Sequence, residues 1–279
     1  MPLDPRTNAF RPDLAARHLQ GRVEARHFVE GVRHQVIEPI ADVRREPAHE
    51  AALDTQALSG ETVLVYETSD EGWCWGQLES DGYVGYLSAN ALGPVAFTPT
   101  HRVGVPRTFG FPGADIKIPP MTALPMGALL EITKQTDRFA LNRYGWHFPL
   151  THVVPLAHKQ PDFVATAESL LGAPYLWGGK SSLGVDCSGL VQLSLQAAGV
   201  LCPRDTYMQE AAPGTAVPLS DLKRGDLIFW KGHVAIARDA ATIIHANGHH
   251  MMVAIEPVVE ALARIKASGS DVTGIKRLS

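Results

Sequence analysis

The stretch DCSGL, residues 186–190, decides how the C-terminal part of this chain should fold. Apolar residues continue beyond it, Asp186 is a residue type that caps helix starts, and Gly199 stands where a helix would end. This pattern predicts a helix over residues 188–198 with Cys187 in its first turn. The positive end of the helix dipole would stabilise a thiolate there, and the thiolate is the nucleophilic form of cysteine.

Two histidines further along the chain flank a short loop. His233 begins the run HVAIA, His245 ends the run TIIH, and residues 238–241 separate them. Runs rich in β-branched residues on both sides of a short loop indicate a β-hairpin. If this hairpin is symmetric about Asp239, the two histidines are directly opposite, with Cβ atoms about 4.5–5.5 Å apart. We therefore expect His245 to orient His233, which would act as general base toward a thiol.

Each residue alone also has a structural interpretation. A lone cysteine at a helix start is often a small buried apolar residue. A lone histidine in a strand is often a polar residue whose hydrogen bonds are satisfied. The combination of Cys187, His233 and His245 in one segment favours nucleophilic catalysis.

Five ordered motifs lie between Pro161 and about Ile275. They are PYLWGG at 174–179, DCSGLVQ at 186–192, RGDL at 224–227, GHVA at 232–235 and HANG at 245–248. This segment resembles the NlpC-type papain-like cysteine peptidases, which cut peptidoglycan peptides. The resemblance implies an α+β papain-like catalytic domain.

By that resemblance the catalytic triad is Cys187, His233 and His245, with a polar residue at the third position in the family. Tyr175 matches a tyrosine that accompanies the site. Its hydroxyl would help the backbone N–H of Cys187 to hold the oxyanion. The alternative is that this ring packs under the turn at Trp177.

Further residues carry over as substrate contacts. Asp186 and Ser188 match positions that line the substrate groove of the family. Arg204 lies where related proteins have a segment near the groove, and we expect it to pair either with a substrate carboxylate or with Asp205 or Asp226 in a structural ion pair.

Composition favours a soluble hydrolase of more than one domain. The chain has 279 residues, 45% of them hydrophobic, and a formal charge of −4 from 29 acidic and 25 basic residues. No basic block indicates binding to nucleic acid or to anionic lipid. The first residues lack the apolar core of a secretory signal, and no run of about eighteen apolar residues follows. With three cysteines we expect free thiols in a reducing cytoplasm, Cys74 and Cys202 being packing residues.

The whole chain divides into four expected segments. Residues 1–38 should be helical, with Asp13 as a cap. Short apolar runs punctuated by glycine indicate a first small barrel at 39–95 and a weaker copy at 96–157. The catalytic domain would occupy 158–279. The barrels resemble two tandem bacterial SH3-like domains, which occur in cytoplasmic members of the family that process free wall peptides.

In such members the first barrel contacts the free amino terminus of the peptide. By position, Tyr83 or Tyr86 is the candidate tyrosine and Glu50 a possible acidic partner, with Asp186 adding charge from the catalytic side. Carboxylates of this kind can receive an alkylammonium group. Tyr86 as a core residue and Glu50 as a solvated loop residue are the alternatives.

The sequence and its resemblance together predict a cysteine endopeptidase. It would hydrolyse the γ-D-glutamyl bond to a diamino acid in a murein peptide with a free N-terminal L-Ala, and serve in recycling. An amidase, an acyltransferase and a non-catalytic wall-peptide-binding protein remain as alternatives. No cofactor is expected, and no metal at His249 and His250, since the family needs none and no cysteine pair has ligand spacing. The diamino acid and the oligomeric state stay open.

Overall fold

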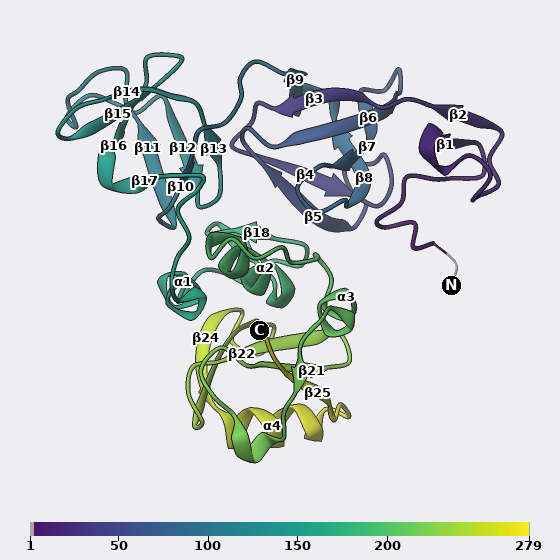
Figure 1. Cartoon of the computed structure of the whole chain (residues 1–279), viewed down its shortest axis with the longest axis vertical. Helices are drawn as coiled ribbons and strands as arrows, with labels where there is room; N and C mark the ends of the chain where they lie inside the picture. The colour runs from purple at the N-terminus through teal and green to yellow at the C-terminus, as the bar shows by residue number, and fades with distance from the viewer. Residues whose placement is uncertain (1–2, 279) are drawn as a thin grey trace. The chain divides into compact units, whose positions relative to one another are not determined.

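The computed structural model describes residues 3–278. The chain forms two compact units, residues 1–156 and residues 157–279, whose elements are labelled in Figure 1. The division falls beside the expected linker, which begins at Ala157. No helix in the described part is long and apolar enough to cross a membrane.

The N-terminal segment is not helical, so that expectation was wrong. It has two short parallel strands, β1 (Leu14–Ala16) and β2 (His27–Val29), and one 3-10 turn at Arg17–Leu19. Leu14, Ala16 and Leu19 pack into one apolar cluster with Trp75 and Val84 of the first barrel. Burial against the barrel outweighs the weak helix propensity of so short a segment.

The first barrel is a seven-stranded sheet in the order β5-β4-β8-β7-β6-β3-β9. It begins before the expected boundary at residue 39. Its apolar core includes Val43, Val63, Leu78 and Leu87. The strands are β3 (Val32–Val36), β4 (Ile40–Arg44), β5 (Leu53–Leu58), β6 (Thr62–Thr68), β7 (Trp73–Leu78), β8 (Val84–Ser88) and β9 (Leu92–Pro94).

A second all-β body follows, with a core that includes Val103, Leu124, Ala140 and Phe148. Its short strands form three small sheets, ordered β13-β10-β17, β11-β12 and β14-β15-β16. The strands are β10 (His101–Val103), β11 (Arg107–Gly110), β12 (Thr122–Pro125), β13 (Leu129–Leu130), β14 (Ile132–Gln135), β15 (Phe139–Asn142), β16 (His147–Pro149) and β17 (Val153–Pro155).

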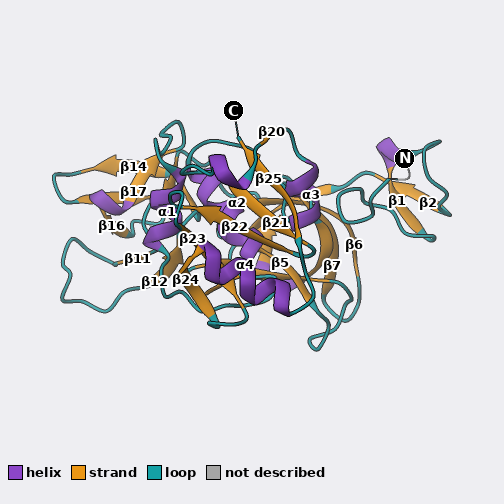
Figure 2. Ribbon diagram, turned by 90° about the horizontal axis from the view of Figure 1, so that it is seen from below, coloured by secondary structure: helices purple, strands orange, loops and turns teal. Residues whose placement is uncertain are grey.

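The second unit holds the α-helices of the described chain, which Figure 2 draws in purple together with the short 3-10 turns. They are α1 (Phe163–Ser169), α2 (Cys187–Ala197), α3 (Thr206–Ala211) and α4 (Val258–Ala267). A two-stranded ribbon, β18 (Lys180–Ser181) with β19 (Gly184–Val185), precedes α2. This content agrees with the expected α+β catalytic domain.

The main sheet of this unit is antiparallel, in the order β20-β25-β21-β22-β23-β24. Figure 1 shows α2 and α4 on opposite sides of it. Ala261 and Ile265 of α4 pack with Ile228, Ala235 and Ile243 in one core. The strands are β20 (Thr215–Ala216), β21 (Leu227–Trp230), β22 (His233–Ala237), β23 (Thr242–Asn247), β24 (Met252–Pro257) and β25 (Val272–Arg277).

Candidate active site

The cysteine lies at the first residue of α2, as the sequence predicts. Asp186 caps the helix because its Oδ1 accepts a hydrogen bond of 2.7 Å from the backbone N–H of Gly189. Gly199, with φ of 75°, follows the C-cap residue Ala198. Cys187 is only 7% exposed. Its sulfur lies beside the backbone N–H of Val234, at the start of β22.

A buried ion pair holds the start of this helix in place. Arg204 is 1% exposed and donates hydrogen bonds to both carboxylate oxygens of Asp186, at 2.9 and 2.7 Å. The carboxylate also accepts a 2.9 Å bond from the backbone N–H of Gly178 and a 3.2 Å bond from the Ser188 hydroxyl. The guanidinium of Arg204 is thus held by Asp186, and its pairing with a substrate carboxylate stays a prediction.

Asp205 and Asp226 were the alternative partners of Arg204; the pairing with Asp205 stays a prediction, whereas Asp226 is occupied elsewhere. Asp226 pairs with Arg277 at 2.8 Å, within the main sheet. Asp186 and Ser188 are both buried, and their contacts described above serve to position the nucleophile. Their roles in lining the substrate groove stay predictions.

The hairpin that carries the two histidines has a register different from the expected one. Ile236 pairs with Ile244, so the ladder is centred on Ala240 and not on Asp239. The reason is the turn, in which the Asp239 carboxylate accepts bonds from the next backbone N–H groups, those of residues 241 and 242, each at 2.7 Å. His233 and His245 are therefore diagonal neighbours and not direct partners.

The diagonal arrangement still brings the two rings together. Nε2 of His233 lies 2.9 Å from Nδ1 of His245, and the ring centroids are 5.2 Å apart. The shift of register is by two residues, so side chains stay on the same face of the sheet. The predicted contact between the histidines is thus present, although its expected register was wrong.

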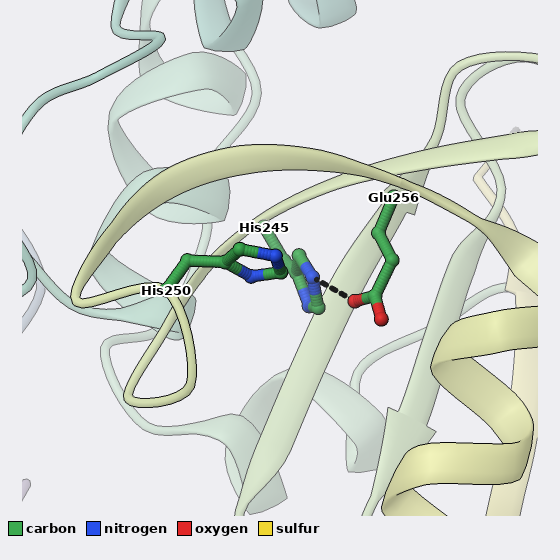
Figure 3. Close-up of side chains that lie close together, drawn as sticks. All are labelled: His245, His250 and Glu256. Carbon is green, nitrogen blue, oxygen red and sulfur yellow. Dashed lines mark hydrogen bonds and ion pairs between the residues drawn. The ribbon is translucent and has the colours of Figure 1, made fainter.

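Glu256 and Arg264, which the sequence did not single out, extend the series of hydrogen-bonded side chains that begins with His233 and His245. Nε2 of His245 lies 3.1 Å from Oε2 of Glu256 on β24, a contact drawn in Figure 3. Arg264 of α4 donates to both carboxylate oxygens of Glu256, at 2.9 and 2.6 Å. A glutamate ending the apolar run MMVAI, residues 251–255, was the available signal, because a carboxylate in such a strand needs a partner.

Burial keeps the reacting groups neutral at rest. Desolvation, followed by the charge of Asp186, raises the pKa of the Cys187 thiol to about 11. Desolvation lowers the pKa of His233 to about 4 and that of His245 to about 3. The expected stabilisation of a resting thiolate by the helix dipole is therefore outweighed, and the thiol must lose its proton to a base as it attacks.

Tyr175 is partly buried in the strand-like segment before α2. Its backbone N–H donates to the carbonyl of Met251 at 2.9 Å. Burial, with the nearby Cys187 and Asp186, raises its pKa to about 12. The hydroxyl therefore stays protonated and is able to donate a hydrogen bond. Its role at the oxyanion stays a prediction.

His245, His250 and Glu256 are grouped closely enough to be considered as metal ligands, with candidate ligand atoms within 4.8 Å of one another. Figure 3 shows the two imidazoles and the carboxylate converging. Each already has a protein partner, since Arg264 occupies the carboxylate and Oδ1 of Asn247 accepts a hydrogen bond from Nδ1 of His250 at 3.0 Å. These three side chains therefore fit a set of internal hydrogen bonds better than they fit a bound metal ion.

The predicted residues of the first barrel differ in their accessibility. Tyr83 is 1% exposed and part of the barrel core, and its contact with substrate stays a prediction. The Tyr86 hydroxyl accepts a 3.0 Å bond from Arg11. Glu50 is exposed in the turn before β5. The substrate contacts expected of Tyr86 and Glu50 stay predictions.

Comparison with known proteins identifies both parts of the chain. Residues 172–266 match the NlpC/P60 family, and residues 43–92 match the bacterial dipeptidyl-peptidase SH3 domain. The second all-β body lies outside these two matches.

Two curated relatives share much of the chain. Dipeptidyl-peptidase 6 of Lysinibacillus sphaericus is 29% identical over 235 residues, which are 76% of this chain and 86% of the relative. The gamma-D-glutamyl-L-lysine dipeptidyl-peptidase of Bacillus subtilis is 32% identical over 197 residues, 64% of each chain.

The fold also has a solved counterpart. A crystal structure of an NlpC/P60 family protein from Bacillus cereus superposes with a TM-score of 0.74, at 20% identity, over 88% of this chain and 99% of the other. The agreement in fold therefore extends beyond the catalytic domain. Since the matched segment contains the cysteine and both histidines of the site, residues 172–266 form an NlpC/P60 cysteine peptidase domain.

Proposed function

We propose that this peptidase hydrolyses the bond between γ-D-glutamate and a diamino acid in murein peptides that carry a free N-terminal L-Ala. The observation that carries the proposal is the buried thiol of Cys187 beside the start of β22, whose first residue His233 is hydrogen-bonded to His245. The name of the Bacillus subtilis relative supports the choice of bond.

The reaction follows from the neutral resting site. His233 takes the Cys187 proton while sulfur attacks the γ-carbonyl carbon, and a C–S bond forms. The backbone N–H of Cys187 and the Tyr175 hydroxyl would donate to the oxyanion. The C–N bond then breaks, and the proton on His233 passes to the leaving amine. Water attacks the thioester, giving its proton to His233 and then to sulfur, which releases the carboxylate product.

The biological setting is part of the same proposal. We place the enzyme in the cytoplasm, acting on released peptides in cell-wall recycling. All three cysteines are free thiols, which suits a reducing compartment. Fractionation of the native organism with an antibody against the chain tests this placement, and recovery outside the cytoplasm would contradict it.

The substrate is tested by incubating the full chain with L-Ala-γ-D-Glu-meso-diaminopimelate, the matching lysine peptide and the N-acetylated form of each. We expect mass spectrometry to detect L-Ala-γ-D-Glu and the released diamino acid from the free peptides only. Cleavage of the acetylated forms would reject the requirement for a free amine. A product with a new acyl acceptor, or loss of ammonia, would indicate the transferase or amidase alternatives.

A matched pair of variants tests the nucleophile. Cys187→Ala should abolish turnover, whereas Cys202→Ala, which removes another buried free thiol of the same unit, should retain it. Peptide binding without turnover in the unaltered protein would instead favour a binding role.

A further inference from the structure

Glu256 is placed to control the protonation pattern of both catalytic-site histidines. An ionised carboxylate only accepts hydrogen bonds, so Nε2 of His245 must carry the hydrogen of the 3.1 Å contact with Glu256. In a neutral imidazole the other nitrogen is then an acceptor. Nδ1 of His245 therefore accepts from Nε2–H of His233 across their 2.9 Å contact.

The consequence reaches the second ring nitrogen of His233, Nδ1. With its hydrogen on Nε2, neutral His233 has an unprotonated Nδ1. We propose that Glu256, held by Arg264, is a positioning residue that sets the tautomers of both histidines and leaves Nδ1 of His233 free to accept the Cys187 proton. This inference rests on the cysteine-peptidase chemistry of the site and does not depend on which peptide bond is cut.

The carboxylate has a fixed orientation. Arg264 contacts it through two nitrogens, Nε and Nη2, in the paired geometry typical of arginine and carboxylate. Glu256 is 6% exposed. Helix α4, which carries Arg264, is itself held by Ala261 and Ile265 in the core. The side chains of Arg264, Glu256 and His245 therefore have little freedom to rotate.

Glu256 contributes by fixing the direction of the hydrogen bonds between the side chains, rather than through its negative charge. The pKa of His233 is lowered to about 4, first by burial and then by the positive charge of Arg264, while the negative charge of Glu256 acts in the opposite sense. The guanidinium thus offsets the carboxylate as seen from His233. A neutral acceptor in place of Glu256 should therefore preserve much of the effect.

The tautomers are measured directly by long-range 1H–15N correlation on the full chain labelled with 15N-histidine. His233→Gln and His245→Asn variants assign the two rings among the twelve histidines. We expect both rings to be protonated at Nε2 in the unaltered protein, and Glu256→Leu to lose this preference. A His245 ring protonated at Nδ1, or an unchanged pattern in the leucine variant, would overturn the proposal.

Kinetics supply the second test. Glu256→Leu should lower kcat about 100-fold with KM changed less than about threefold, since correct proton transfer contributes a factor of this order. Glu256→Gln keeps a carbonyl acceptor and should recover at least about tenfold over leucine. An equal loss of kcat in both variants would mean that Glu256 acts through its charge or through folding stability, and not by fixing the direction of the hydrogen bonds.

A control separates positioning from general stability. Asp226→Asn removes another buried carboxylate that an arginine of the same sheet holds, Arg277, without touching the histidines. It should leave the tautomers and the kcat unchanged.

The rate of alkylation of Cys187 by iodoacetamide, followed by mass spectrometry, should fall in Glu256→Leu as turnover does. Because this reaction needs no peptide, an incorrect choice of substrate would not affect it.

Discussion

Replacing Arg204 by leucine should test whether the buried ion pair supports the nucleophile helix. In that variant the Asp186 carboxylate loses two guanidinium contacts, of 2.9 and 2.7 Å, and keeps only neutral donors. Leaving a buried charge without its partner costs about 3–5 kcal/mol. We expect the bonds from Gly178 and Gly189 to the carboxylate to place the loss near the lower end of that range. Arg204→Leu should thus destabilise the second unit by about 3 kcal/mol.

The measurement is hydrogen exchange by mass spectrometry, which reports α2 separately from the first unit. Arg224→Leu is the matched control, because its partly exposed ion pairs with Asp162 and Glu168 should be worth about 1 kcal/mol or less. In the double variant with Asp186→Asn, the loss should be smaller than the sum of the two single losses. Equal losses for Arg204→Leu and Arg224→Leu, or simple additivity in the double variant, would refute this reasoning.

Three further predictions concern pH and the backbone. Because burial lowers the pKa of His233 from 6.5 to about 4, the unfolded chain takes up a proton in this interval that the folded chain does not, so stability should be full above pH 6.5 and fall toward pH 4. Thermal melting should show the fall, and His233→Gln should reduce it. Asp239→Ala removes two bonds of 2.7 Å in the hairpin turn and should lower the midpoint of urea unfolding; no change would contradict the role of the turn. Gly189→Ala would place a Cβ 2.4 Å from the carbonyl oxygen of Gly179 and should reduce activity strongly, whereas Gly248→Ala, with open space, should not; equal activities would disprove the clash.

Local patterns allowed the helix of the nucleophile to be predicted to within one residue. The capping oxygen of Asp186 and the glycine at 199 act on backbone groups nearby in the chain. Such interactions depend little on distant parts of the fold. The contact between His233 and His245 was equally recognisable from the hairpin pattern.

The N-terminal segment shows where local patterns fail. Leu14 and Ala16 allow a helix by composition, but the segment is extended and packs on the first barrel. Packing also determines the position of Tyr83, whose side chain lies in the barrel core. In both cases long-range packing, which sequence spacing does not encode, decided the outcome.

The sequence by itself determined that Cys187 starts a capped helix and that both histidines lie on one face of a hairpin, because helix caps and the two-residue period of a strand are local properties. Only the tertiary structure decided which atoms meet. The turn at Asp239 moved the register by two residues, and α4 brought Arg264 to Glu256 behind His245. The physical reason is that burial, which sets the pKa of the thiol and imidazoles, arises from elements that fold together only in three dimensions.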